Sequence, residues 1–399
     1  MTTIAIIGGG AAGFFAAANL PQVEKVYFFE GTARPLTKVK ISGGGRCNVT
    51  HNLFDLKAFA ASYPRGAKEL LGPFHTFGPQ DTIAWFNSRG VVLKAEADGR
   101  MFPDTNKSQT IIDCLTTAIA KSGVTLQDKT IISSIRFLSP GFEIQRKNEE
   151  VLRVDKLLLA TGSSPIGHKL AASLGHQIVE PMPSLFSFGI EDPLLTELAG
   201  ISFRRVGIKL FDKHRLGPLV ITHWGLSGPC VLWLSAFGAR ELCAAAYQAP
   251  ITINWLGDTK ETHVSEEFAR LRRDMGQTAV VNPLFDLPKR FWQRLVQLSG
   301  IEPKQLWAEL PKAKEKELIS RLIRSNLTIT SKGEFKEEFV TAGGIDRREI
   351  DFRTFGSKLC PGLFFAGEII DIDGVTGGFN FQNAWTSGFL AAKAMASVG

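Results

Sequence analysis

A glycine-rich turn near the start of the chain constrains its fold more than any other feature. The apolar run Thr3–Ile7 is typical of a buried parallel strand, and Gly8-Gly-Gly-Ala-Ala-Gly13 follows it directly. A helical pattern then continues until Pro21, and residues 26–29 form a second apolar strand. A strand, a G-x-G-x-x-G turn and a helix in this order predict a βαβ unit that binds a dinucleotide.

Each glycine of this turn has its own physical role. Gly8 permits the tight turn, Gly10 lets the backbone approach a pyrophosphate, and Gly13 lets the helix pack closely on the strand. The pyrophosphate would lie beside Ala11 and Ala12 of the turn, at the positive N-terminus of the helix that follows. A glycine turn without a ligand is the alternative interpretation.

Glu30 ends the second strand, 17 residues after Gly13. A carboxylate at this place accepts hydrogen bonds from both ribose hydroxyls of an adenosine and repels a 2′-phosphate. NADP is therefore disfavoured at this site, whereas FAD and NAD are not separated by this unit alone.

A second glycine-rich segment follows, from Lys38 to Thr50. Ser42 and three consecutive glycines precede Arg46, Cys47 and Asn48. Such a backbone can fold against a flat ring, and Arg46 supplies a fixed positive charge. A flexible surface loop is the alternative interpretation.

The C-terminal block repeats the pattern of strand, glycine turn and helix. An apolar strand enters at Leu363 and ends at Glu368, and a glycine-rich turn then leads to a helix of small residues from Ala384. The helix N-terminus would stabilise negative charge on the N1–C2 edge of a reduced flavin. A buried helix with no ligand is the alternative interpretation.

These motifs together resemble the YhiN/BaiN-like family of NAD(P)/FAD-dependent oxidoreductases. The resemblance extends from residue 4 to residue 395, and it depends on five motifs: Gly8–Gly13, Ser42–Asn48, Thr222–Pro229, Thr341–Gly344 and Phe365–Gln382. It implies an α/β fold with a glutathione-reductase-like, Rossmann-type FAD-binding domain that is made from the two ends of the chain. It also implies an inserted β-barrel and a small helical subdomain.

The strand and helix patterns suggest boundaries for these parts. We expect the N-terminal part of the FAD-binding domain, the β-barrel, the helical subdomain, a return strand of the barrel and the C-terminal part of the FAD-binding domain to span, in this order, residues 1–185, 186–263, 264–325, 326–342 and 343–399.

The resemblance further implies an extended FAD. Its adenosine would lie at Glu30, its pyrophosphate at Gly10–Gly13 and its isoalloxazine ring near Cys47 and Asn380. The strand that enters at Ile132 would offer backbone groups to adenine. The predicted cofactor-binding residues are Gly8, Gly10, Ala11, Ala12, Gly13, Glu30, Lys38, Ser42, Gly43, Gly44, Arg46, Cys47, Asn48, Ile132, Ala160, Thr161, Gly162, Gly367, Glu368, Gly378, Phe379, Asn380 and Phe381.

Two residues are candidates for catalysis beside the flavin. A flavin transfers hydride at N5, and the protein sometimes supplies a proton. Cys47 is the first candidate donor, with Arg46 expected to lower its pKa. Its alternative is a small residue packed against the ring. His223 is the second candidate, although a lone histidine at such a place is more often a structural hydrogen-bonding group.

No second G-x-G-x-x-G follows a strand in residues 186–340. Reductases with a resident NAD domain normally carry such a motif in their insert. We therefore expect NAD(P)H, if it is the electron donor, to bind only transiently.

Three functions from different classes remain open. The first is a flavoprotein oxidoreductase that reduces an activated C=C bond or oxidises an amine in a small molecule. The second is an RNA-directed flavoenzyme that forms dihydrouridine from uridine, with phosphates bound by a basic insert. A solvated surface would explain that basic insert as well. The third is a non-enzymatic flavin redox sensor. The basic residues of the insert are Arg204, Arg205, Lys209, Lys213, Arg215, Arg270, Arg272, Arg273, Lys289, Arg290 and Arg294.

Composition restricts the remaining classes. The five cysteines are odd in number and form no C-x-x-C, so neither a disulfide framework nor a zinc site is expected, and a cytoplasmic location fits. The net charge of +7 permits an anionic partner. The apolar stretches 1–20 and 218–239 are interrupted by glycine or proline, so we expect no contact with a membrane. The cysteine pattern leads us to expect no metal.

Overall fold

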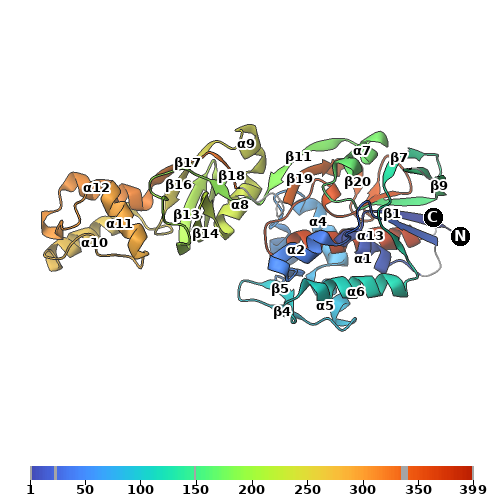
Figure 1. Cartoon of the computed structure of the whole chain (residues 1–399), viewed down its shortest axis with the longest axis horizontal. Coiled ribbons are helices and arrows are strands. Elements are labelled where there is room, and N and C mark those ends of the chain that lie inside the picture. Colours follow the sequence, from blue (N-terminus) through green and yellow to red (C-terminus); the bar gives the residue numbers. More distant parts are fainter. Residues whose placement is uncertain (1, 22–24, 148–149, 334–339, 398–399) are drawn as a thin grey trace. The chain divides into compact units, whose positions relative to one another are not determined.

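The computed structural model describes residues 2–21, 25–147, 150–333 and 340–397. The chain divides into two compact units (Figure 1). Unit 1 combines residues 1–182 with residues 340–399, and unit 2 consists of residues 183–339. The finer predicted division into barrel, helical subdomain and return strand stays a prediction.

Unit 1 is built on a seven-stranded sheet whose centre is parallel. Apolar strands form this centre because both of their faces are covered. β1 pairs in parallel with β2 on one side and with β10 on the other. The order across the sheet is β20 (Ile350–Asp351), β21 (Gly356–Ser357), β22 (Leu363–Phe365), β10 (Lys156–Leu159), β1 (Thr3–Ile7), β2 (Lys25–Phe29) and β6 (Leu126–Gln127).

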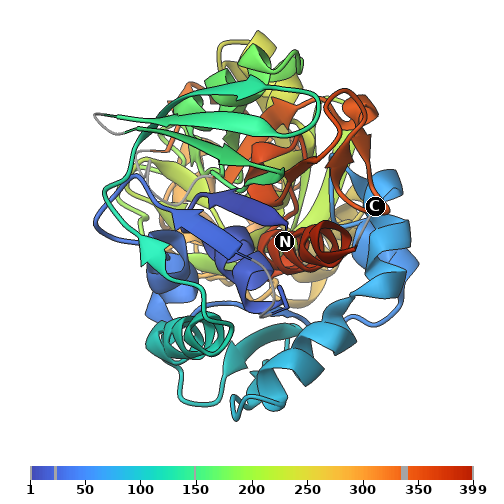
Figure 2. The ribbon, with the colours of Figure 1, turned by 90° about the vertical axis from the view of Figure 1, so that its right-hand side faces the viewer.

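Helices and a second sheet cover the two faces of the parallel strands. α1 (Ala11–Ala18) packs against both α13 (Phe379–Ala396) and α6 (Ser108–Lys121). Figures 1 and 2 show these helices on one side of β1 and β2, and a three-stranded antiparallel sheet on the other side. That sheet consists of β7 (Ile132–Phe137), β8 (Phe142–Arg146) and β9 (Val151–Val154).

Shorter elements surround this framework. β11 pairs with β19, and β5 lies between β3 and β4. The remaining elements of unit 1 are α2 (Thr37–Gly45), β3 (Thr50–His51), α3 (Leu56–Ala60), α4 (Ala67–Thr76), α5 (Pro79–Asn87), β4 (Leu93–Ala95), β5 (Arg100–Pro103), α7 (Pro165–Ser173), β11 (Ile178–Ser184), β19 (Val340–Ile345), η2 (Arg347–Glu349) and η3 (Gly367–Ile369).

Unit 2 is built on a seven-stranded antiparallel sheet. β13 and the second half of β14 bury apolar residues on one face, as expected for strands with one covered face. The order is β17 (Ser325–Ile329), β16 (Ala249–Asn254), β13 (Ser202–Leu210), β14 (Lys213–Thr222), β15 (Gly225–Ser227), β12 (Phe188–Gly189) and β18 (Ser331–Lys332).

Helices in the described part of unit 2 share the core of its sheet. Trp255, which directly follows β16, packs against Phe291 of α11, with ring centroids 4.5 Å apart. The buried aliphatic and aromatic side chains of sheet and helices form one cluster. The helices are α8 (Pro229–Phe237), α9 (Ala239–Ala244), α10 (Glu261–Asp274), α11 (Lys289–Leu298), η1 (Trp307–Glu309) and α12 (Lys312–Ile323).

Candidate cofactor and active site

Four predicted cofactor residues lie where parallel strands of unit 1 end. Gly8 follows β1, Glu30 follows β2, Ala160 follows β10 and Gly367 comes shortly after β22. The carboxyl ends of parallel strands meet at one edge of a sheet, where ligands of open α/β sheets bind. The fold therefore brings residues from both ends of the chain to one site.

The turn between β1 and α1 has the geometry that each glycine was expected to provide. Gly8 has φ +116°, and a Cβ there would lie 2.3 Å from the carbonyl oxygen of Ala160. A Cβ on Gly13 would lie 2.0 Å from the carbonyl oxygen of Gly8. At Gly10, by contrast, no atom lies within 4 Å of such a Cβ. The helix N-terminus at Gly10 also has no side-chain cap, which leaves its N–H groups to an anion.

Glu30 is fixed by the same turn. Its Oε2 accepts a hydrogen bond from the backbone N–H of Gly9 at 2.7 Å, and its Oε1 accepts one from Thr32 at 2.8 Å. Each carboxylate oxygen keeps a further lone pair. The position fits the predicted contact with ribose hydroxyls.

A cavity of about 330 Å³ lies beside this edge, between β7 and α7. Ile132, predicted to offer its backbone to adenine, lines it together with Ile166 and Lys169. The strand β10 leads into Thr161 and Gly162, and Gly162 has φ +60°. The hydroxyl oxygen of Thr161 is buried without a hydrogen-bond partner in the described structure.

The segment after α2 departs from helical geometry where its glycines occur. Ser42, Gly43 and Gly44 have non-helical dihedral angles. Gly43 packs on Phe102, and a Cβ on Gly43 would lie 2.9 Å from that ring. A Cβ on Gly44 would have no atom within 4 Å. Arg46 places its guanidinium over the Phe102 ring at 4.0 Å and forms an ion pair with Glu96 at 2.5 Å.

The pKa of Cys47 is raised, whereas the sequence led us to expect a lowered one. Its side chain is completely buried, and burial raises the pKa of the thiol to about 12, although a hydrogen bond with Ser42 opposes this shift. The prediction that Arg46 lowers this pKa is therefore wrong. Desolvation outweighs the neighbouring charge, and the Arg46 guanidinium is already paired with Glu96.

The C-terminal glycine turn contacts the segment that carries Asn48. A Cβ on Gly378, which has φ +93°, would lie 2.4 Å from the carbonyl oxygen of Thr50. With its amide oriented to satisfy both groups, Asn48 donates to the Thr50 carbonyl and accepts from the N–H of Gly378, each at 3.0 Å. The two predicted ring-binding segments therefore lie together.

The residues that follow Gly378 pack mainly within the protein. Asn380 accepts from the N–H of Gly374 and donates to its carbonyl oxygen, both at 2.8 Å. Phe379 stacks on His51 with ring centroids 5.0 Å apart, and Phe381 stacks on Trp385 at 5.6 Å. Their contact with a flavin stays a prediction.

Glu368 and Lys38 form an ion pair between η3 and α2. The other carboxylate oxygen of Glu368 accepts from the backbone N–H of Thr341 at 2.9 Å. Gly367, with φ +76°, donates its N–H to Ser387 in α13 at 2.9 Å. These contacts connect the segment after β22 with α2, β19 and α13.

The residues present fit FAD. Open space at Gly10, the uncapped start of α1 and the free lone pairs of Glu30 match the pyrophosphate and ribose. The orphaned hydroxyl of Thr161 adds a polar group at the same edge.

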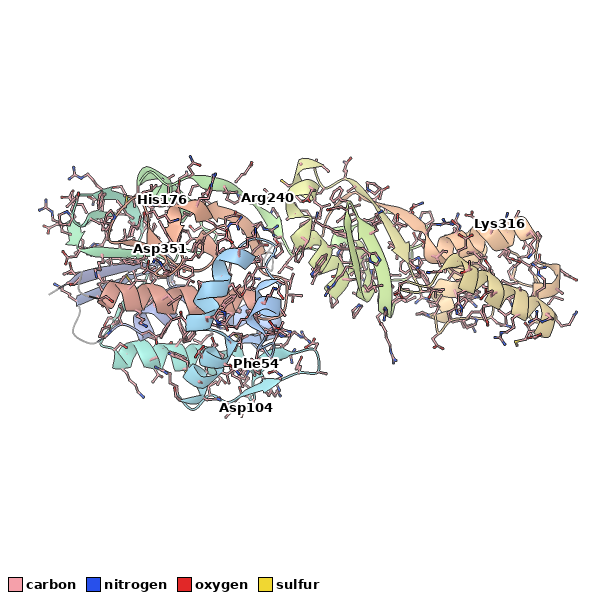
Figure 3. All side chains as sticks on the ribbon, turned by 180° about the vertical axis from the view of Figure 1, so that it is seen from behind. Phe54, Asp104, His176, Arg240, Lys316 and Asp351 are labelled. Carbon is pink, nitrogen blue, oxygen red and sulfur yellow. The ribbon has the colours of Figure 1, made fainter. Side chains whose placement is uncertain are left out.

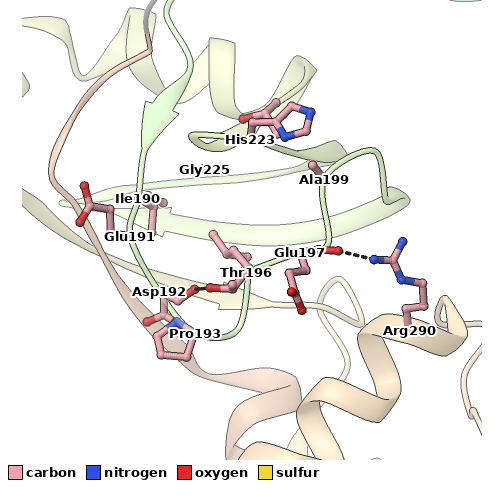
Figure 4. Close-up of a pocket in the computed structure, with 12 residues that line it drawn as sticks. Ile190, Glu191, Asp192, Pro193, Thr196, Glu197, Ala199, His223, Gly225 and Arg290 are labelled. Carbon is pink, nitrogen blue, oxygen red and sulfur yellow. Dashed lines mark hydrogen bonds between the residues drawn. The ribbon is translucent and has the colours of Figure 1, made fainter.

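His223, the second predicted catalytic residue, lies in unit 2. It lines a cavity of about 600 Å³ together with Thr222, Glu197 and Arg290 (Figure 4). Arg290 donates to the carbonyl oxygen of Glu197. The role of His223 in catalysis stays a prediction.

Three further residues near the ring-binding segments were not predicted. Burial lowers the pKa of His51, which stacks on Phe379, and the nearby Asp98 opposes this shift. Tyr63 donates a hydrogen bond to the carbonyl oxygen of Phe379, and Arg65 pairs with Asp373 in the loop before Gly378. Of these three residues, only His51 could have been suspected from the sequence, because it directly follows the glycine-rich segment that ends at Thr50.

A Ser-His-Glu chain of hydrogen bonds also occurs in unit 1. His176, labelled in Figure 3, contacts Glu349 through Nδ1 and Ser357 through Nε2, each at 2.9 Å. The Ser357 hydroxyl oxygen accepts from the backbone N–H groups of Leu359 and Cys360. Its lone pairs are therefore occupied, which argues against a nucleophile and for a structural role.

Comparisons with known proteins cover nearly the whole chain. A family model described as HI0933-like protein Rossmann domain matches residues 2–394. A ribosomal RNA dihydrouridine synthase of Escherichia coli is 32% identical, over 97% of this chain and 96% of that protein. A 3-dehydro-bile acid delta(4,6)-reductase of Clostridium scindens is 27% identical over 99% of both chains.

A solved structure confirms the predicted fold class. The 3-ketosteroid-delta4-(5alpha)-dehydrogenase from Rhodococcus jostii RHA1 superposes with a TM-score of 0.50 at 14% identity. The match covers 98% of this chain and 96% of that chain. Separately, no helix in the described part of this chain is both long and apolar enough to cross a membrane.

Proposed function

Because the chain belongs to the HI0933-like family, we propose that this FAD-dependent oxidoreductase reduces a carbon–carbon double bond conjugated with a carbonyl group in a small molecule. The observation that carries the proposal is the agreement between two relatives that match nearly the full chain. Their names, delta(4,6)-reductase and dihydrouridine synthase, both describe the loss of a carbon–carbon double bond. They favour reduction over amine oxidation, the other chemistry that the sequence leaves open.

Different segments of unit 1 bind different parts of the cofactor. Bound FAD supplies hydride transfer at its N5 atom. The turn Gly8–Gly13 and the N-terminus of α1 hold its pyrophosphate, and Glu30 holds the ribose. The segments 43–48 and 377–381 hold the ring, where the N-terminus of α13 favours negative charge.

Reduction of a double bond also requires a proton at the second carbon. The thiol of Cys47 holds a proton at neutral pH, but a pKa of about 12 makes it a weak acid. An efficient general acid has a pKa near the working pH. Cys47 therefore suits packing against the ring better than proton delivery.

The electron donor and the compartment belong to the same proposal. NAD(P)H binds transiently, which is supported by the lack of a second dinucleotide turn in residues 186–340. The five cysteines are free thiols, which supports a reducing compartment such as the cytoplasm.

RNA is the second candidate substrate, because the relative with 32% identity is named for ribosomal RNA. The charges of unit 2 weaken this alternative. Among the residues that the structure describes, six of the eleven basic residues of the insert lie within 4.0 Å of a carboxylate oxygen: Arg205, Lys213, Arg270, Arg272, Arg273 and Arg294. Positive charge that is neutralised in this way contributes less to phosphate binding.

A single-turnover experiment tests the proposal. Purified holoprotein is reduced without oxygen and then mixed with an α,β-unsaturated ketone, with its saturated analogue as the matched control, or with ribosomal RNA. Flavin absorbance reports reoxidation. The proposal expects rapid reoxidation by the unsaturated ketone alone.

Two results would contradict it. Reoxidation by RNA but not by the ketone would establish the second candidate. A purified chain without flavin absorbance that takes up no added FAD would refute both candidates. Tight binding of NADPH to the holoprotein in the absence of substrate would contradict the prediction that NAD(P)H binds only transiently.

A further inference from the structure

A short segment of unit 1, Ser62–Gly66 between α3 and α4, lies along the loop that precedes α13. We call this loop, residues 371–378, the ring loop. Arg65 and Asp373 form an antiparallel backbone bridge, and the Arg65 guanidinium pairs with both carboxylate oxygens of Asp373. Their side chains are only 7% and 0% exposed. The pair is therefore shielded from water, where a bidentate contact fixes position and orientation together.

Three further contacts join Ser62–Gly66 to the ring loop and to the first residue of α13. The N–H of Val375 donates to the carbonyl oxygen of Ser62 at 2.9 Å. The hydroxyl of Tyr63 donates to the carbonyl oxygen of Phe379 at 2.5 Å. A Cβ on Gly66, which has φ +97°, would lie 2.7 Å from the Ile372 side chain, so the Gly66 backbone packs directly on that side chain.

These contacts leave one part of the ring loop accessible. Residues 371–375 are buried, whereas Thr376 is exposed and Gly378 is partly exposed. The first half of the loop and the first turn of α13 are thus held from one side by Ser62–Gly66. The accessible part is the one that leads into the helix N-terminus.

We propose that Ser62–Gly66 positions the ring loop against the flavin, with Arg65 and Tyr63 as the positioning residues. The inference rests on the FAD binding proposed above. Neither residue belongs to the turn that holds the adenosine half. Changes at Arg65 and Tyr63 therefore affect the ring half of the cofactor and leave the adenosine half unchanged.

Two conservative variants test this inference. Arg65→Lys keeps the charge but removes the planar fork that bonds both carboxylate oxygens. Tyr63→Phe removes only the hydroxyl that bonds Phe379. Arg272→Lys is the matched control, because it makes the same substitution in the ion pair with Glu315 in unit 2. For each full-length variant, FAD affinity, ADP affinity and the absorbance bands of the bound flavin are measured.

We expect Arg65→Lys to weaken FAD binding roughly tenfold or more, and Tyr63→Phe roughly two- to tenfold. The flavin absorbance bands shift toward those of free FAD in both variants, ADP affinity stays within about twofold of wild type, and Arg272→Lys changes nothing. If Arg65→Lys does not fold, the FAD affinity, ADP affinity and flavin absorbance of Tyr63→Phe decide whether the inference holds.

Unchanged FAD affinity and absorbance in folded variants would overturn the inference and leave the proposed function intact. Equal weakening of FAD and ADP would overturn it too, because the segment would then support unit 1 as a whole. A wild-type chain that binds ADP but no FAD would instead refute the proposed function.

Discussion

Replacing Gly10 by alanine separates cofactor binding from folding. Gly10 is the N-cap of α1, with φ −90° and ψ −172°, a conformation that alanine adopts without strain. No atom lies within 4 Å of the added Cβ. The folded apoprotein therefore accommodates the methyl group, which occupies the space that we assign to the pyrophosphate.

The expected stability change is small because two effects oppose each other. Reduced freedom of the unfolded chain stabilises a compatible Gly→Ala variant by about 0.4–1 kcal/mol. Alanine is a poorer N-cap than glycine, at a cost of about 0.5–1 kcal/mol. The free energy of unfolding of the apoprotein should therefore stay within about 0.5 kcal/mol of wild type. A methyl group in a filled site costs about 1–3 kcal/mol, which weakens FAD binding roughly 5- to 150-fold.

Urea unfolding and titration of the apoprotein with FAD measure the two quantities. Gly72→Ala serves as the control, because Gly72 is an exposed residue inside α4 that also has nothing within 4 Å of its Cβ position. It should leave FAD affinity unchanged, and its stability should change little, because Pro73 follows and disfavours a Cβ on a preceding helical residue. A folded Gly10→Ala variant that binds FAD as tightly as wild type would refute the placement of the pyrophosphate.

Two further predictions concern ionisable groups. Because burial raises the pKa of Cys47 to about 12, iodoacetamide at about pH 8 should leave it unmodified until the chain unfolds, as peptide mass mapping would show. Modification as fast as at the partly exposed Cys243 would contradict this result. Burial also lowers the pKa of His176 below 6.5, although Glu349 opposes the shift, so the unfolded chain takes up this proton first as the pH falls. The free energy of unfolding should therefore fall as the pH drops below 6.5, less steeply in His176→Asn; equal slopes in urea unfolding would exclude this contribution.

The local parts of the fold could be predicted from the sequence because short-range chemistry determines them. The apolar run Thr3–Ile7, the glycines of the turn and Glu30 occur in an order that only a βαβ unit explains, and β1, α1 and β2 confirm it. The C-terminal order of strand, glycine turn and helix could likewise be predicted, and β22 and α13 have this order. The resemblance implied that the two ends of the chain meet in one domain, and β10 pairs with β22 in one sheet.

The parts that could not be predicted depend on distant residues. Arg65 and Asp373 lie 308 positions apart, and neither has a local pattern that points to the other. The acidity of Cys47 was misjudged because a neighbouring charge is visible in a sequence, whereas complete burial is not. For the same reason, spacing alone could not separate paired from unpaired basic residues in unit 2.

The order of strands in unit 1 has a consequence for synthesis on the ribosome. β10 can pair with β1 as soon as residue 159 has emerged, but its other neighbour, β22, begins only at residue 363. In the interval the nascent polypeptide carries an open sheet edge, which is prone to pairing with other chains. The intervening unit 2 is continuous in sequence and can complete its own sheet during this delay. We therefore expect the yield of folded, cofactor-binding protein to depend on translation speed and on early chaperone binding.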